Sequence, residues 1–227
     1  MQRQMDIQLE KLKKMMIEMS SIVENQVELT FLSVKEGNKD LAKKVIELDN
    51  DVDKYDVKIE KLCQRIFALN QPYAMDLRFI MSAFAINNNL ERIGDIAVNI
   101  SESAISLKAL PHFIEQTKFF EMSEVVKEML KDSIDSYIRT DADLSKKVIA
   151  TDDKLDNLNS ENCSYLKELM KKDSAAIDEA LNFFVISRQV ERMGDHCTNI
   201  AENVYFIVEA QLIKHKYEKQ MFLDEEE

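Results

Sequence analysis

The chain has 227 residues, with 42 acidic against 30 basic side chains and a formal net charge of −12 at pH 7. This acidity argues against direct binding to nucleic acid, which requires a basic surface that displaces phosphate counterions. Only three glycines and two prolines occur, too few for the turns of a β-sandwich or barrel and for glycine-rich phosphate loops. We therefore expect an all-α protein.

The expected helices are separated by glycine, proline and capping signals. Gly37 ends a first helix, and Asn38 or Asp40 can cap a second. Pro72 separates the second helix from a third, which ends at Pro111. Beyond it, the segments RTDAD near residue 140 and KKDSA near residue 174 are capping-type breaks. The sequence thus predicts three helices followed by three more.

An internal repeat supports this division. Residues 91–102 read ERIGDIAVNISE and residues 191–202 read ERMGDHCTNIAE, with seven of twelve positions identical. The tetrapeptide KKVI at 43–46 recurs at 146–149. The repeat predicts two tandem three-helix bundles related by internal duplication, which we place at residues 1–110 and 111–227.

Apolar residues of the second expected helix recur in alternating three- and four-residue steps, a pattern typical of helices that pack at small angles. The core positions expected there are Leu41, Val45, Leu48, Val52, Tyr55, Ile59, Leu62, Ile66 and Leu69.

The longest segment without a charged side chain runs from Phe79 to Leu90, so no segment approaches the ~20 apolar residues that span a bilayer. The chain does not open on an apolar signal core. Its three cysteines form no CxxC pair, which suits a reducing compartment. We therefore expect a cytoplasmic protein, and the charge-poor segment offers apolar surface for a homodimer.

Acidic residues spaced four apart carry the candidate chemistry. Glu91 and Asp95 share one helix face, and Glu191 and Asp195 do so in the other repeat. Like charges at this spacing cost roughly 0.2–0.5 kcal/mol per pair unless a cation lies between them. Carboxylate oxygens suit a hard or borderline metal ion. The alternative is a solvated helix face of an acidic protein, without any ligand.

Gly94 and Gly194 each lie inside an expected helix, where glycine costs about 1 kcal/mol relative to alanine. Either a neighbouring helix approaches closely there, or a ligand or partner needs the clearance. His196 lies off the acidic face, so we expect it to serve packing or hydrogen bonding. No Glu-x-x-His motif and no set of nucleophile, base and orienting acid occurs, so we expect no enzymatic activity.

The segment QPYAMDLRFIMSAFAINNNLERIGDIAVNI from Gln71 and the segment ERMGDHCTNIAENV from Glu191 closely resemble the PhoU family of phosphate-transport accessory regulators. The resemblance covers nearly the entire chain and includes the segment KKVIELDNDVD from Lys43. Its paired E-R-x-G-D signatures and the proline before the third helix make it specific.

The resemblance implies a regulator that acts with an ABC phosphate transporter ATPase and a sensor histidine kinase. Such a protein keeps the phosphate-starvation response off when phosphate is plentiful, and it reaches the membrane only through its partners. PhoU-like bundles often form homodimers. A metal-buffering protein and an accessory of another phosphate permease, such as a sodium-coupled one, are the alternatives.

Some family members bind multinuclear iron or zinc clusters through ExxxD and DxxxD motifs. On this chain the resemblance implies metal ligands at Asp49, Asp53, Glu91, Asp95, Asp152, Asp156, Glu191 and Asp195. Asn159 and Cys163 replace acids of the first repeat, and Asn70 stands where the family commonly has arginine. The two bundles therefore need not bind metal equally.

Overall fold

A computed structural model describes residues 4–107, 110–211 and 213. Within these residues the chain forms six α-helices and two short 3₁₀ turns, without any strand, so the expected all-α class is confirmed. The helices are α1 (Gln4–Glu36), α2 (Lys39–Leu69), α3 (Ala74–Ser106), α4 (Phe119–Arg139), α5 (Ala142–Lys172) and α6 (Ile177–Glu209), with η1 (Ile114–Gln116) before α4 and η2 (Ser174–Ala176) before α6.

The helix breaks occur where the sequence predicts them. Gly37 adopts the left-handed backbone, with φ at 62°, and the side chain of Asn38 accepts hydrogen bonds from the next helix's first amides. In the second repeat, Thr140 takes the left-handed position, with φ at 56°, and Asp141 caps α5. The same chain reversal is therefore built with different residues in the two repeats.

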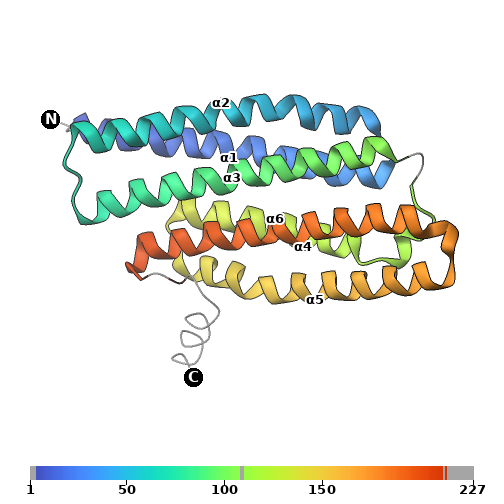
Figure 1. Ribbon diagram of the computed structural model, residues 1–227. Coiled ribbons are helices and arrows are strands. Elements are labelled where there is room, and N and C mark those ends of the chain that lie inside the picture. Colours follow the sequence, from blue (N-terminus) through green and yellow to red (C-terminus); the bar gives the residue numbers. More distant parts are fainter. Residues whose placement is uncertain (1–3, 108–109, 212, 214–227) are drawn as a thin grey trace, which may run out of the picture.

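The six helices form two three-helix bundles, α1–α3 and α4–α6, which lie side by side (Figure 1). This confirms the tandem arrangement that the repeat predicts. The exact division between residues 110 and 111 stays a prediction, and residues 214–227 of the second range lie outside the described residues.

The bundles meet chiefly through α3 and α6, which run in opposite directions (Figure 1). Asn89 on α3 lies between the bundles, and its Oδ1 is 2.9 Å from Nδ1 of His196 and 3.3 Å from Nδ2 of Asn199. Phe79 on α3 also stacks on Tyr137 of α4, with ring centroids 6.1 Å apart. Helices α3 and α6, together with this stack, are called the seam below.

The segment from Phe79 to Leu90 packs largely inside the chain. Ile80, Ala83, Ile86 and Leu90 are buried, and Phe79 takes part in the seam. The two repeats therefore cover most of the apolar surface of this segment themselves, and Met81, at 54% exposed, is the large apolar side chain that it leaves open. A homodimer stays a prediction.

Most of the expected core positions of α2 are buried, including Val45, Val52, Ile59 and Ile66. Leu41, Leu48 and Tyr55 are half-buried, and Leu69 alone of the nine is exposed, over 66% of its surface. It is the last residue of α2, where the helix ends and the periodic pattern no longer implies burial. Within the described residues, no helix is both long enough and apolar enough to cross a membrane.

Candidate functional site

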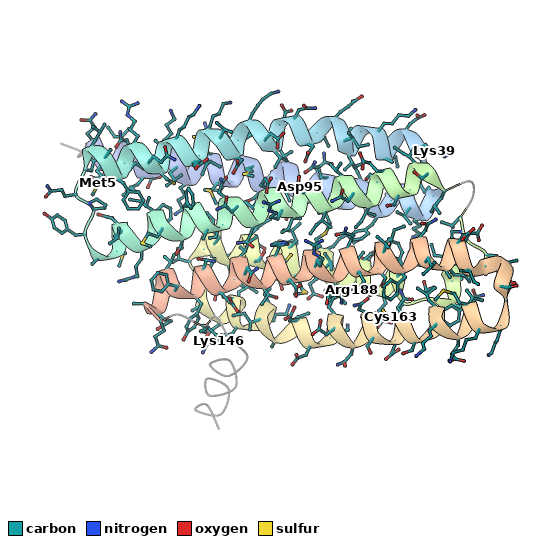
Figure 2. All side chains as sticks on the ribbon, in the orientation of Figure 1. Met5, Lys39, Asp95, Lys146, Cys163 and Arg188 are labelled. Carbon is teal, nitrogen blue, oxygen red and sulfur yellow. The ribbon has the colours of Figure 1, made fainter. Side chains whose placement is uncertain are left out.

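The four predicted acids of the first repeat come together where α2 packs on α3. Burial raises the pKa of Asp49, and the negative charges of Asp53 and Asp95 raise it further. The pKa of Glu91 is likewise raised by burial and by Asp95, while Arg92 lowers it. This surface, formed by Asp49, Asp53, Asp56, Glu91 and Asp95, is called the first acidic face. Asp95 lies near the middle of α3 (Figure 2).

Neutral amides support the first acidic face from inside the bundle. Gln26, which is fully buried on α1, donates from Nε2 to Oδ1 of Asp49 at 3.2 Å. Asn87, buried on α3, donates from Nδ2 to Oδ1 of Asp56 at 2.5 Å. The amides fix two carboxylates in place without neutralising them.

Arg92 supplies the positive charge on this face. Its Nη1 lies 3.1 Å from Oδ2 of Asp95, and its Nε lies 3.4 Å from Oε2 of Glu91. The arginine side chain is 62% exposed, so these pairs are screened by water and contribute little to stability.

The predicted acids of the second repeat gather in the same way between α5 and α6. Desolvation, together with the charges of Glu191, Asp152 and Asp156, raises the pKa of Asp195 to about 6. Arg188 donates from Nη1 to Oε1 of Glu191 at 2.8 Å and lies near the middle of α6 (Figure 2). These four acids form the second acidic face.

The two faces differ where the sequence departs from the repeat. Asn159 replaces Asp56, and Ser187 takes the place of Asn87. In the second repeat Ser187 Oγ donates to Oδ1 of Asn159 at 3.0 Å, and Asn162 Nδ2 donates to Ser187 Oγ at 2.8 Å. Buried hydrogen bonds between neutral side chains thus occupy the position where the first repeat has the Asp56 carboxylate. The second acidic face therefore carries less negative charge.

The donor chemistry of both faces suits a cation with oxygen ligands. Three buried oxygens beside the faces also lack a hydrogen-bond partner among the described residues, namely Gln26 Oε1, Asn87 Oδ1 and Glu191 Oε2. In the described part of the chain, however, no three His, Cys, Asp or Glu side chains are close enough together to hold a metal ion. The predicted acids therefore lie on the same two faces, but their side chains do not converge on a common position that a metal ion could occupy. The eight ligand assignments stay predictions.

The two helical glycines have different neighbours. A Cβ at Gly94 would lie 3.2 Å from both Asp49 Oδ1 and Gln26 Oε1, whereas a Cβ at Gly194 would overlap Cδ2 of Leu155. Gly194 thus permits close approach of a neighbouring helix. Gly94 leaves room for the oxygens of the first acidic face.

Sequence reasoning missed the polar residues that support the faces. Gln26, Asn87 and Thr198 come from buried helix positions, and Thr198 Oγ1 donates to Oδ1 of Asp152 at 3.2 Å. The signal that could have identified them is a polar residue at a helix position where the three- and four-residue period predicts an apolar one. His196 makes the hydrogen-bond contact across the seam that its off-face position predicts.

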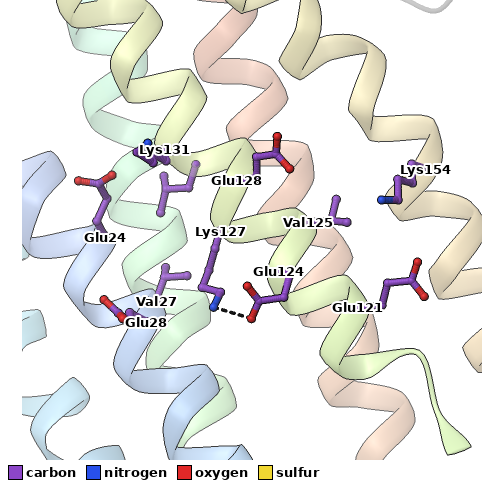
Figure 3. A pocket seen from close by; sticks show the side chains of 11 residues that line it. Glu24, Val27, Glu28, Glu121, Glu124, Val125, Lys127, Glu128, Lys131 and Lys154 are labelled. Carbon is purple, nitrogen blue, oxygen red and sulfur yellow. Dashed lines mark ion pairs between the residues drawn. The ribbon is translucent and has the colours of Figure 1, made fainter.

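A separate groove of about 540 Å³ lies between α1 and α4 (Figure 3). Glutamates and lysines line it, and Lys127 Nζ pairs with Oε1 of Glu124 at 2.6 Å. Burial and the charge of Asp135 raise the pKa of Glu24 at its rim, while Lys131 lowers it. The groove is mixed in charge and brings together no nucleophile with a base.

Two paired three-helix bundles with an acidic face on each define a class of duplicated helical proteins. The family model for the PhoU domain matches this chain twice, at residues 16–104 and 119–204. The chain therefore belongs to the PhoU domain family.

Curated relatives carry the same family name. The phosphate-specific transport system accessory protein PhoU homolog of Aquifex aeolicus is 37% identical, over 94% of this chain and 96% of its own. The phosphate-specific transport system accessory protein PhoU of Escherichia coli is 32% identical, over 93% of this chain and 88% of its own. Both relatives are named as accessory proteins of a transport system.

Solved structures support the fold. The crystal structure of PhoU from Pseudomonas aeruginosa superposes with a TM-score of 0.87 at 32% identity. The superposition covers 92% of this chain and 100% of the crystallised chain. The phosphate transport system regulatory protein PhoU from Streptococcus pneumoniae superposes with a TM-score of 0.86, and at 24% identity it supports the fold alone.

Proposed function

We propose that this chain regulates phosphate uptake and signalling by coupling the ATPase of an ABC phosphate transporter to a sensor histidine kinase. In this role it keeps the phosphate-starvation response off when phosphate is plentiful. One observation carries the proposal: relatives named as phosphate-specific transport system accessory proteins align with 93–94% of the chain.

The proposed mechanism is non-enzymatic docking by a homodimer on the cytoplasmic side of the membrane. Each bundle offers a separate surface, and the acidic faces differ in charge because Asn159 replaces Asp56. Two unlike surfaces on one chain suit two unlike partners, since a transporter ATPase and a kinase need not resemble each other.

Deletion of the gene in its native host tests the regulatory role. We expect high phosphatase secretion in phosphate-rich medium, and repression should return when the intact gene is supplied in trans. Normal repression in the deletion strain would contradict the proposal. If phosphate uptake through a sodium-coupled permease changed instead, the chain would serve that permease.

Co-purification tests the partners directly. The tagged chain should retain the transporter ATPase and the sensor kinase in mild salt, because complementary charges stabilise such contacts and salt screens them. Recovery of neither partner, with the transporter expressed, would exclude the coupling role.

We propose in addition that the two acidic faces bind iron or zinc through their carboxylates. The three unpartnered buried oxygens favour this proposal, because they are free to accept from or coordinate a ligand. The pKa values of Asp195 and Glu91 agree with it, since they are raised by burial and by the negative charge of neighbouring acids. A bound divalent cation would supply that charge. Gln26 and Asn87 would then hold Asp49 and Asp56 toward the first face.

Elemental analysis after anaerobic purification tests the metal. We expect stoichiometric iron or zinc in the intact chain and loss of about half or more of it in Glu91→Ala/Asp95→Ala. Asp51→Ala/Asp143→Ala is the matched control, because these exposed acids pair with Lys54 and Lys146 outside the faces. Equal metal content in both variants would contradict the assignment and leave solvated acidic surfaces.

A further inference from the structure

Three large apolar side chains are exposed at one end of the first bundle, at the turn from α2 to α3. Leu69 is 66% exposed, Tyr73 is 73% exposed and Met75 is 67% exposed. The turn lies at the same end of the molecule as the start of α1 (Figure 1), where Ile7 is 56% exposed. These four residues, together with Lys61 and Arg65 of α2, are called the basic tip below.

The basic tip is held in place by hydrogen bonds. Asn70 Nδ2 donates to Oε1 of Gln8 on α1 at 2.9 Å and to the carbonyl oxygen of Ile66 at 3.3 Å. The amide of Asp76 donates to the carbonyl oxygen of Tyr73 at 2.9 Å. The apolar side chains therefore stand on an ordered turn, and their exposure is a property of the folded chain.

The charge of the turn from α2 to α3 and of the helix segments beside it is opposite to that of the whole molecule. Residues 57–81 contain four basic and two acidic side chains, in a chain whose net charge is −12. Lys61 and Arg65 are exposed, and neither pairs with an acid in the described part of the chain. This end can therefore attract an anionic surface although the rest of the molecule is repelled by one.

The corresponding turn of the second bundle lacks both features, and the exposed apolar side chains near it, Ile177 and Leu181, lie on α6 beyond the turn. Residues 160–181 contain three basic and five acidic side chains. The turn there reads DSAA, from Asp173 to Ala176, so small and polar residues stand where the basic tip has Leu69, Tyr73 and Met75. The duplication thus provides an internal comparison, in which only one of two equivalent turns is apolar and basic.

We propose that the basic tip binds the interface of an anionic lipid bilayer directly, without a protein partner. Leu69 and Arg65 are one helical turn apart, which corresponds to about 6 Å along α2. Apolar side chains of a surface-bound protein enter the boundary of headgroups and acyl chains by about 5–10 Å. Insertion of Leu69 and Met75 therefore places the Arg65 guanidinium at the level of the lipid phosphates.

Tyr73 has the chemistry of this boundary, because its ring is apolar and its hydroxyl can remain in contact with water. The acidic remainder of the molecule does not prevent binding. At physiological salt, charges more than about 8 Å from the surface are largely screened, so the basic tip dominates close contact. The proposal requires neither the transporter nor a metal on the acidic faces.

Sedimentation of the purified full chain with lipid vesicles tests the proposal. We expect it to pellet with vesicles rich in phosphatidylglycerol and to remain in the supernatant with pure phosphatidylcholine, with binding that weakens as salt is added. Leu69→Ser/Met75→Ser should lower the partition coefficient at least about tenfold through lost apolar burial. Lys61→Gln/Arg65→Gln should remove the preference for anionic lipid.

Ile177→Ser/Leu181→Ser is the matched control, because it removes two exposed apolar side chains at the opposite end. It should bind vesicles as the intact chain does, and circular dichroism should show that all variants keep their helix content. The proposal is overturned if the intact chain does not pellet, or if the control loses as much binding as Leu69→Ser/Met75→Ser. It is also overturned if Leu69→Ser/Met75→Ser leaves vesicle binding unchanged but lowers the molecular mass measured by light scattering. That result would make the basic tip an interface between copies of the chain.

Discussion

Gly94 and Gly194 occupy equivalent positions, yet substitution by alanine should affect them differently. Alanine gains about 1 kcal/mol of helix propensity at either site. At Gly194 the new methyl overlaps Leu155, which is fully buried, and overpacking a core costs about 1–3 kcal/mol. We expect Gly194→Ala to lower the free energy of unfolding by about 1 kcal/mol.

Gly94→Ala is the comparison for this substitution. Its Cβ meets two side-chain oxygens at 3.2 Å, which can yield by a few tenths of an ångström, so we expect a smaller change in stability. Urea denaturation followed by circular dichroism measures both variants. A Gly194→Ala variant as stable as Gly94→Ala would show that Leu155 moves aside without cost.

Asp195 should make the stability of the metal-free chain depend on pH. Its pKa rises from 3.8 to about 6 on folding, so the folded state binds more protons than the unfolded state between these values. The stabilisation that protonation of Asp195 gives the folded state is therefore complete below pH ~4. It decreases as the pH rises through about 6 and is lost above that value. The melting temperature in chelator should fall over this window, and Asp195→Asn should reduce that fall.

Of the residues at the candidate site, only the charged ones could be predicted from the sequence. Acids spaced four apart identify a helix face, and the duplication identifies the face twice. Gln26 and Asn87 could not be assigned in this way, because their role depends on which helix of the bundle packs beside the carboxylate. Spacing within one helix contains no information about a neighbour.

At the scale of elements, the caps of α2 and α5 provide a test of the duplicated design. Asn38 Oδ1 accepts from the amides of Asp40 and Leu41 at 3.1 and 3.3 Å, and Asp141 Oδ1 accepts from Leu144 at 3.0 Å. We expect Asn38→Ala and Asp141→Ala each to cost about 1 kcal/mol of stability.

Thermal unfolding measures both cap variants, with Tyr73→Ala as the comparison, because the Tyr73 side chain makes no capping hydrogen bond to α3. A loss of stability in Tyr73→Ala as large as in the two cap variants would show that the position, and not the hydrogen bond, sets the cost.

The six helices were predictable because their ends carry local signals. Gly37, Pro72 and Pro111 stop or separate helices through their own backbone geometry, and the structure confirms a break at each. The packing of Phe79–Leu90 was not predictable. Its apolar pattern requires a partner surface, and only the fold shows that the other half of the chain provides one.

For the whole molecule, the seam should couple the two bundles into one unfolding unit. Phe79→Ala removes the stack on Tyr137 and part of the packing between bundles, so we expect a loss of about 2 kcal/mol. Tyr137→Phe is the control, because its buried hydroxyl has no hydrogen-bond partner among the described residues. Its removal should leave stability unchanged or raise it by up to about 1 kcal/mol.

Equilibrium denaturation provides the measurement for the seam. The intact chain should unfold in a single transition, and Phe79→Ala should shift its midpoint. If the intact chain unfolded in two separate transitions, the seam would not couple the bundles.

The opposed directions of α3 and α6 have a consequence for how the chain diversified. Two copies of one bundle, joined in this way, reproduce the isologous contact of a symmetric dimer within a single polypeptide. In a dimer of identical subunits, every substitution appears on both sides of the axis. Covalent linkage removes that constraint, and in this chain Asn159 is found in the second repeat only and the apolar turn at Leu69 in the first repeat only.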